Sequence, residues 1–370
     1  RRMMFLESTH RFSVLSVTSN TIPKTINNHN NQDDRNEDQG MKTKNLATDS
    51  IPCIPLSRFF LSSSSSSSSS NHETNHIQKE EQQESILRQD ILHALETYGY
   101  LVLTLPRTSK QARVVQEFQD CLYSEFFPDG QSSVSYSYQS EDDIYISEIG
   151  IPMWRVGYEN SCQQTSKDSN NDPQGDREAF RVPVSSLSDV IFPSSKSSNV
   201  WKQACKLCQR ICDRALELTL PNCSKEPATN GPRPRNRQDD LSVLYAMHYF
   251  NTNIEQKTSQ QSNQQDEVIN VKPHVDPSLF VLEPFIPEQP GLQIWSQGQW
   301  VTCDGPESPI YHTLDSNDTA MVLFVGKAFH RHCPQVEPTL HRVIATKQQR
   351  RIAAIFEQKY REYYPPPTFD

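Results

Sequence analysis

Residues 241–250 read Leu241-Ser-Val-Leu-Tyr-Ala-Met-His-Tyr-Phe250, and the pattern of the chain changes at this stretch. Before it, apolar residues recur at helical spacing. After it, short runs rich in Val, Ile, Phe, Tyr and Trp alternate with Gly, Pro, Asn and Asp. These later runs are Gly291–Trp295, Gln299–Cys303, Ala320–Val325 and Arg351–Phe356. Many short strands at close spacing are typical of a β-sandwich or barrel, so we expect an antiparallel β core in this half.

The sequence upstream of this stretch is mainly helical in pattern. Apolar spacing predicts helices over 86–98, 114–126 and 200–220, and a buried strand at Tyr100–Leu105. The proline-bounded run Ile51–Phe59 suits an edge strand, because an edge tolerates the missing N–H of proline. We therefore expect a mostly β fold with flanking helices, most of them in the N-terminal part.

The same patterns predict the domain organisation. We expect a disordered tail or transit segment at 1–50, a mainly helical region at 51–220, a β domain at 221–360 and a C-terminal tail at 361–370. The serine tract at 62–70 cannot bury apolar area, and it is expected to form a loop. Residues 4–31 contain a single acid, Glu7, which is typical of transit peptides. Targeting to an organelle thus stays an alternative to a cytoplasmic location.

Bulk composition narrows the classes of partner. The formal net charge of −9 argues against a nucleic-acid or anionic-membrane surface, since both need a basic stripe. No apolar run approaches the roughly 18 residues of a membrane span. The nine cysteines are odd in number and irregular in spacing, which fits free thiols in a reducing compartment. We expect a small-molecule substrate as partner, and the sequence does not indicate an oligomeric state.

Three of the cysteines share one face of the helix expected over 200–220. Cys205, Cys208 and Cys212 are three and four residues apart, which is compatible with a metal or cluster site. The same face carries Ala204 and Ile211, and free cysteine is among the most buried residue types. A packing face is therefore preferred to a metal site.

The segment Val271-Lys-Pro-His274-Val-Asp276 carries residues suited to bind a metal. Residues two apart in a strand point to the same side, so His274 and Asp276 are expected to face one side. His341, in Leu340-His-Arg-Val343, is the candidate for a third ligand. Two histidines and one carboxylate leave half of the coordination sphere open, which suits Fe(II) that must bind a co-substrate and O2. Alone, His-x-Asp is common, and a hydrogen-bonded histidine is the competing interpretation.

The order of motifs from His274 to Phe356 resembles the C-terminal half of the isopenicillin N synthase-like branch of the 2-oxoglutarate/Fe(II) oxygenases. The N-terminal half resembles that branch more loosely. The similar segments are His274-Val-Asp276-Pro-Ser-Leu, Gly291-Leu-Gln-Ile-Trp295, Gly298-Gln-Trp-Val301, Ala320–Gly326, His341-Arg-Val343, Ile51–Phe59, Leu92–Leu105 and Arg177–Arg181. The resemblance implies a double-stranded β-helix, or jelly-roll, core with a helical N-terminal part. It also implies that His274, Asp276 and His341 are the metal ligands.

The resemblance further implies Fe(II), 2-oxoglutarate and O2 as cofactors. Arg351 lies ten residues after His341, where the family's arginine binds the far carboxylate of 2-oxoglutarate. A guanidinium suits this role because it binds carboxylates in a bidentate manner and keeps its charge. Tyr249 preserves a co-substrate hydroxyl if it takes the place of the family's tyrosine, whereas Phe250 in that place loses it. Ala353 departs from the pattern, because the family usually has a serine there.

The expected function is oxidative decarboxylation of 2-oxoglutarate coupled to hydroxylation or desaturation of a small organic substrate. No catalytic residue beyond the metal ligands is predicted. Three alternatives remain at this point. Ala353 keeps open an Fe(II) oxidase of the same fold that does not use 2-oxoglutarate, although Arg351 argues against it. A non-catalytic binding relative and a zinc hydrolase with the same ligands are the others.

Overall fold

The computed structural model describes residues 51–60, 73–128, 157–160, 177–188, 190–220, 239–249, 269–306, 308–345 and 351–364. The predictions for residues 1–50, for the serine tract and for Phe250 concern positions outside these ranges. Residues Leu46–Asp370 form one compact unit. The predicted regions on either side of residue 220 therefore contribute to the same unit.

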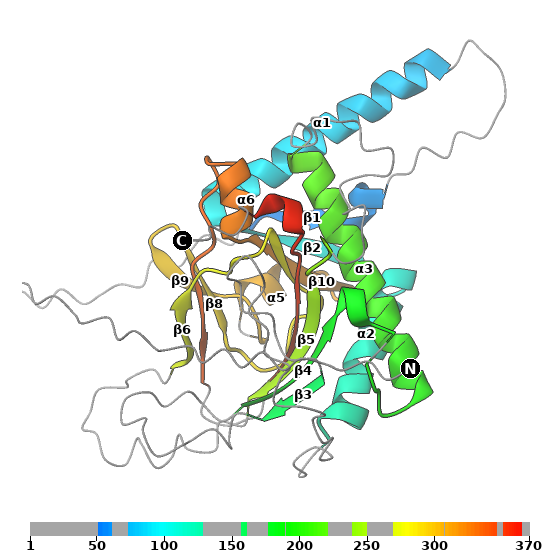
Figure 1. Ribbon diagram of the computed structural model, residues 1–370. Helices are drawn as coiled ribbons and strands as arrows, with labels where there is room; N and C mark the ends of the chain where they lie inside the picture. The colour runs from blue at the N-terminus through cyan, green and yellow to red at the C-terminus, as the bar shows by residue number, and fades with distance from the viewer. Residues whose placement is uncertain are drawn as a thin grey trace, which may run out of the picture. The chain divides into compact units, whose positions relative to one another are not determined.

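The strands within the described residues form two sheets, of eight and four strands (Figure 1). The larger has the order β1-β2-β10-β7-β12-β5-β4-β3. Its strands are β1 (Cys53–Pro55), β2 (Tyr100–Pro106), β3 (Gly157–Asn160), β4 (Arg177–Pro183), β5 (Val243–Tyr249), β7 (Phe280–Glu283), β10 (Asp318–Val325) and β12 (Arg351–Glu357). The smaller has the order β6-β11-β8-β9. Its strands are β6 (Ile269–His274), β8 (Leu292–Ser296), β9 (Gln299–Thr302) and β11 (His341–Ile344).

The arrangement of β5 to β12 is a jelly roll. The strands β5, β7, β10 and β12 pair in the larger sheet, and β6, β8, β9 and β11 pair in the smaller one, all antiparallel. The chain thus crosses between the sheets at almost every turn. Apolar residues of both sheets pack between them, among them Val281 and Phe324 from the larger sheet and Ile294 from the smaller. The prediction of a jelly-roll core is confirmed.

The N-terminal part extends the larger sheet and covers its outer face. β1 and β2 add one edge, where β1 runs parallel to β2, and β3 and β4 add the other. Three long helices form the helical layer seen beside the sheet in Figure 1. They are α1 (Glu73–Tyr98), α2 (Lys110–Cys121), continued by a π-helical turn (Leu122–Phe126), and α3 (Ser195–Thr219). Short helices α5 (Pro309–Thr313) and α6 (Lys327–His332) lie in connections, and 3-10 turns occupy Leu56–Phe60, Val184–Ser186 and Arg361–Tyr363.

The helical layer is held by a large apolar core and by local caps. Trp201 of α3 is fully buried, with ring centroids 5.0 Å from Phe118 and 5.2 Å from Phe180. Ser194 and Ser197 form a capping box at the start of α3, and each satisfies a backbone N–H of the other. The expected helices and edge strand are therefore confirmed, with boundaries within a few residues except at α1, which begins earlier than predicted.

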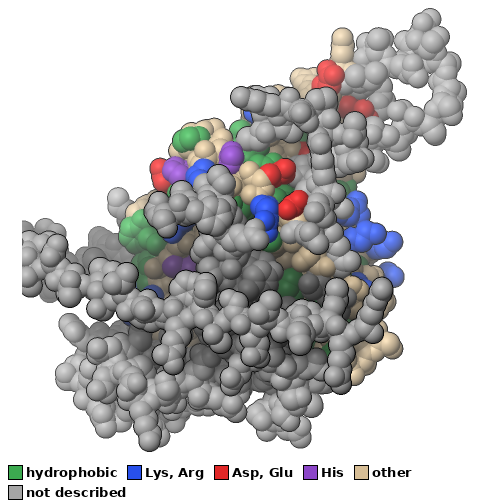
Figure 2. Space-filling model, viewed as in Figure 1, with side chains coloured by type: hydrophobic (Ala, Val, Ile, Leu, Met, Phe, Trp, Pro, Cys, Tyr) green, Lys and Arg blue, Asp and Glu red, His purple; other side chains and the backbone are tan. Residues whose placement is uncertain are grey.

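Charged side chains are unevenly distributed over the described surface. In Figure 2, Lys and Arg side chains gather on the described surface over α3, and Asp and Glu over α1. Among the described residues, no helix is both long and apolar enough to cross a bilayer.

Candidate metal centre and cavity

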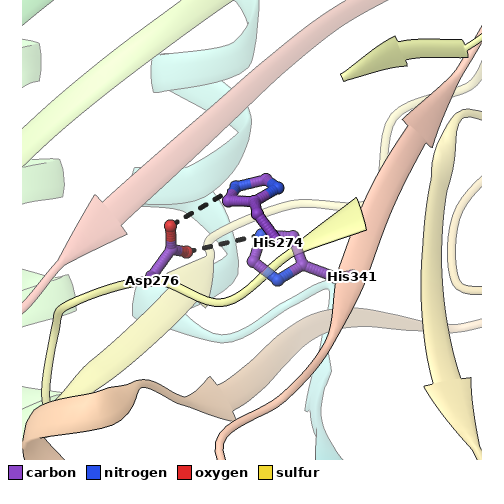
Figure 3. A group of neighbouring side chains, drawn as sticks. All are labelled: His274, Asp276 and His341. Carbon is purple, nitrogen blue, oxygen red and sulfur yellow. Dashed lines mark ion pairs between the residues drawn. The ribbon is translucent and has the colours of Figure 1, made fainter. Parts of the chain in front are cut away.

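The two histidines of the site are neighbours across a strand pair. His274 ends β6, His341 begins β11, and their Cα atoms are register partners in the antiparallel ladder. Their rings lie with centroids 4.2 Å apart. Asp276 lies two residues beyond the end of β6 and turns its carboxylate toward both rings (Figure 3). The two side chains do point to one site, as expected. The expectation that both residues lie in one strand is wrong, because β6 and its pairing with β11 end at His274.

The turn that places Asp276 is fixed by close backbone packing. The carbonyl oxygen of Asp276 accepts a hydrogen bond of 2.8 Å from the N–H of Lys327. A Cβ atom at Gly326 would lie only 2.7 Å from that carbonyl oxygen. Glycine at 326 therefore lets the end of β10 approach the segment that carries the ligand.

The three side chains are arranged as a ligand set. His274 Nε2 lies 3.5 Å from Asp276 Oδ1, and His341 Nε2 lies 3.4 Å from Asp276 Oδ2. One ligand atom from each residue can be chosen so that all lie within 4.8 Å of one another, and no other such group of His, Cys, Asp and Glu occurs in the described residues. Both histidines use Nδ1 toward backbone carbonyls, 2.9 Å from Lys272 O and 3.1 Å from Thr339 O. Nε2 of each ring is thus directed toward the shared point.

Charge and burial shape the protonation of the three ligands. Burial lowers the pKa of His341 below its usual value, which favours the neutral imidazole that binds metals. Burial also opposes a charge on His274, but Asp276 beside it raises the pKa of that ring. Burial would raise the pKa of Asp276, but the hydrogen bond from His274 and the electrostatic interactions with the two rings lower it instead. The carboxylate is therefore ionised, as a metal ligand must be.

The ligands line a cavity of about 340 Å3 between the two sheets. This volume falls within the range of small-molecule sites. Residues from β4 to β12 surround it, and most of its wall is apolar, with Val281, Leu292 and Phe324 among the lining residues. Its buried ionic groups gather around Arg351 and around Lys359.

Arg351 is buried in this cavity between two carboxyl groups. Its Nε and Nη2 lie 2.9 and 2.5 Å from Asp304 Oδ2, and Nη2 also lies 3.0 Å from Glu283 Oε1. Its Nη1 forms no hydrogen bond with the described residues. Asp304 is itself fixed, because its oxygens accept the backbone N–H groups of Gly291 and Leu292 at 2.6 and 3.0 Å. Arg351 thus has a set orientation with one guanidinium nitrogen left for a ligand.

Tyr249 also faces the cavity beside Arg351. The two residues are register partners between β5 and β12, and the guanidinium carbon lies 5.6 Å from the centre of the tyrosine ring. The hydroxyl of Tyr249 donates a 3.4 Å hydrogen bond to the sulfur of Met247. The structure therefore places Tyr249 and Arg351 together, as the predicted co-substrate residues require.

Two of the residues around Arg351 were not predicted as site residues. Asp304 follows β9, and its Asp-Gly sequence indicates only a turn. Glu283 ends β7, in the otherwise apolar run Leu279–Pro284. A single charged residue in such a buried run needs a partner, and this signal could have identified Glu283.

A second ionic group lies where the chain leaves β12. Lys359 forms an ion pair with Glu357, and Glu357 accepts a 2.8 Å hydrogen bond from the hydroxyl of Tyr245. Arg181 of β4 covers the Tyr245 ring, with 5.7 Å from guanidinium carbon to ring centre. These four side chains are buried and line the same cavity as the metal ligands.

The cysteine face of α3 is a packing face. Cys205, Cys208 and Cys212 are buried in the core between the helices and the larger sheet. Burial raises the pKa of each thiol, which keeps these sulfurs neutral and poorly suited to bind a metal. The three cysteines therefore pack in the core, as the packing interpretation predicts.

The comparisons with known proteins find likeness in structure only. No family model and no curated protein matches this sequence. Solved structures that resemble the chain include a putative 2OG-Fe(II) oxygenase family protein from Caulobacter crescentus (13% identity, 84% of this chain and 86% of that chain, TM-score 0.49). The dioxygenase for auxin oxidation of rice gives 14% identity, 84% and 83% coverage and a TM-score of 0.47. A full-length Neurospora crassa protein in complex with alpha-KG and thymine has 13% sequence identity and a TM-score of 0.48, and the match covers 84% of this chain and 86% of that chain.

Proposed function

We propose that this protein is an Fe(II)- and 2-oxoglutarate-dependent oxygenase that oxidises a small organic substrate by hydroxylation or desaturation. The observation that carries the proposal is one cavity that holds both a His-Asp-His ligand set and a buried arginine whose Nη1 has no hydrogen-bond partner among the described residues. The first feature suits a metal with open positions, and the second suits a carboxylate of the co-substrate.

The ligand set fits an iron ion. Ligand atoms about 2.1 Å from a metal and at right angles to each other lie about 3 Å apart. The Nε2-to-carboxylate distances of 3.4 and 3.5 Å need only a small contraction to reach this value. Three protein ligands leave open positions, as a metal that binds a co-substrate and O2 requires. When bound, Fe(II) supplies the O2 chemistry that converts 2-oxoglutarate to succinate and CO2 and oxidises the substrate.

Arg351 and Tyr249 would hold the end of the co-substrate away from the metal. Asp304 and Glu283 fix the guanidinium, so that little side-chain freedom is lost when a carboxylate binds Nη1. A 2-oxo acid has a second carboxylate and a ketone for the metal. A linear dicarboxylate therefore matches the distribution of cationic groups in the cavity.

The apolar wall and the Lys359 group would serve the substrate. Val281, Leu292 and Phe324 exclude water from the apolar side of the cavity, which strengthens the electrostatic interactions on that side of the site. Lys359 and Glu357 give the cavity a polar patch against which a polar group of the substrate can be oriented. We infer a small organic substrate with both apolar and polar parts.

The test is an anaerobic titration of the purified protein with Fe(II) and then 2-oxoglutarate. The chelate of a 2-oxo acid with Fe(II) gives a weak visible charge-transfer band. We expect the band in the wild type, its loss in His341→Ala, its weakening in Arg351→Gln, and no change in the matched control His312→Ala at an exposed histidine. Iron binding without a band would favour the Fe(II) oxidase of the same fold. Absence of iron binding would overturn the proposal.

A further inference from the structure

The group around Arg351 contains more carboxyl groups than its charge can balance. One guanidinium faces both Asp304 and Glu283, and all three side chains are almost completely buried. If both acids were ionised, the group would carry a net negative charge before any ligand entered. A third carboxylate on Nη1 would then meet repulsion in a medium that screens charge poorly. A bound dicarboxylate thus requires that one of the two acids be neutral.

The contacts distinguish the two acids. Asp304 accepts hydrogen bonds from two backbone N–H groups and from Arg351, and donors of this kind favour a carboxylate. Glu283 receives a single hydrogen bond, at Oε1. Its Oε2 is buried and has no hydrogen-bond partner among the described residues, although Glu283 lines the cavity. Glu283 is therefore the acid that can hold a proton at low cost.

The described surroundings of Glu283 contain no further cation that would keep it ionised. From the strand beside it, β12, only Arg351 faces its carboxyl group, and Val322 is its partner on β10. Asp304 adds a negative charge, and the thiol of Cys303 is kept neutral because burial raises its pKa. Burial, opposed by Arg351 and assisted by Asp304, raises the pKa of Glu283 to about 8.

We propose that Glu283 is a co-substrate-binding residue that carries a proton, and that its Oε2 donates a hydrogen bond to the carboxylate held by Arg351. The inference rests on the proposed function, because it names a second residue of the same co-substrate site. Protonation turns an acid that repels the ligand into a donor for it. Binding is then coupled to the retention of one proton on Glu283.

The test measures the affinity for 2-oxoglutarate between pH 7 and 9, by anaerobic titration with Fe(II) present. A ligand that binds only the protonated form of a group with a pKa near 8 loses about tenfold in affinity over this range. Glu283→Gln keeps an acceptor for Arg351 and an uncharged donor, so we expect it to bind with little dependence on pH. The matched control Glu117→Gln alters an exposed glutamate of α2 outside the cavity and should retain the pH dependence of the wild type.

A second readout is infrared difference spectroscopy between pH 7 and 9. The carbonyl stretch of a protonated carboxylic acid should be present at pH 7 and absent from Glu283→Gln. A wild-type affinity that stays constant from pH 7 to 9, or a Glu283→Gln variant that keeps the tenfold loss, would overturn the inference while leaving the proposed function intact. Iron binding without any 2-oxoglutarate binding at either pH would instead overturn the proposed function.

Discussion

Two buried ionic groups line the same cavity, and they differ in how their charges balance. Around Lys359, the ion pair joins one cation to one carboxylate, Glu357, and a second cation, Arg181, covers the Tyr245 ring. Around Arg351, one cation meets two carboxyl groups, Asp304 and Glu283. The first group also receives the Tyr245 hydroxyl. Oε2 of Glu357 and Oε2 of Glu283 are both buried without a hydrogen bond among the described residues, but Oε2 of Glu357 lies in the ion pair with Lys359. In the second group, the hydrogen bonds of Arg351 use Nε and Nη2 and leave Nη1 without a partner among the described residues.

This contrast separates a closed ion pair from a group that can bind a carboxylate. Burial is nearly equal in the two groups, so burial alone does not identify either group as a binding site. A balanced ion pair can be buried in the folded protein without a bound ligand or an added proton. An unbalanced group with unused donors and acceptors stays costly until a ligand or a proton completes it.

Arg351→Met should disturb the molecule most. The change leaves Asp304 and Glu283 buried without their cation, and breaking such a group costs about 3–5 kcal/mol. We expect a loss of that size in the free energy of unfolding, measured in urea, together with loss of 2-oxoglutarate binding. The triple variant with Asp304→Asn and Glu283→Gln removes the uncompensated charge and should recover most of the stability but none of the binding. A triple variant as unstable as the single one would contradict this explanation.

Lys359→Met tests the other group. It leaves Glu357 buried beside the Tyr245 hydroxyl alone, and we expect a destabilisation of about 3 kcal/mol. Because Lys359 belongs to the balanced pair, affinity for 2-oxoglutarate with saturating Fe(II) should stay at the wild-type level. Urea unfolding and the anaerobic titration measure the two properties separately. Weaker co-substrate binding would mean that the two groups act as one site.

Gly291→Ala disturbs the Arg351 group through its packing. A Cβ atom at this position would lie 2.6 Å from Arg351 Cδ and 2.7 Å from Nε, closer than real contacts allow. Overpacking of this kind costs about 1–3 kcal/mol. The guanidinium must shift, so we expect reduced stability and a lower 2-oxoglutarate affinity. Thermal unfolding and the titration measure both, and an unchanged affinity would show that the orientation of Arg351 is not critical.

A pH dependence of stability follows from the protonation of Glu283. In the folded chain Glu283 holds a proton at pH values where a free glutamate, with a pKa near 4.3, has lost it. The folded state therefore binds more protons, and stability from this group falls as pH rises, by at most about 1.4 kcal/mol per unit until about pH 8. Glu283→Gln lacks this dependence. From pH 5 to 8, the free energy of unfolding of the wild type should therefore fall relative to that of Glu283→Gln. A difference between the two that stays constant over this range would contradict the prediction.

The sequence predicted the parts of the fold that local patterns encode. Period-2 and apolar runs identified most of the jelly-roll strands, and helical spacing identified α1, α2 and α3. It did not identify β4, because Arg177–Pro183 has polar residues within a strand that is recognisable only by its pairing with β5. Pairing partners distant in sequence cannot be read from local preference.

The candidate site was predictable to a similar degree. Spacing pointed to His274 and Asp276, the family resemblance added His341, and the structure brings the three together. The sequence marks Glu283 only as a buried acid that needs a partner, and it does not pair either acid with Arg351, since Asp304 lies 47 residues away from it and Glu283 lies 68. The charge balance of the group is a property of the tertiary structure alone.

The two histidines of the metal centre differ in exposure, with consequences for metal exchange. The side chain of His274 is 41% exposed and that of His341 is 7% exposed. Asp276 and His341 thus form the inner half of the site, and His274 forms the side that faces solvent. An incoming ion would meet His274 first, and a chelator would displace the same ligand first. Rates of metal loading and stripping should therefore follow the protonation of this one imidazole, whereas equilibrium retention depends on all three ligands.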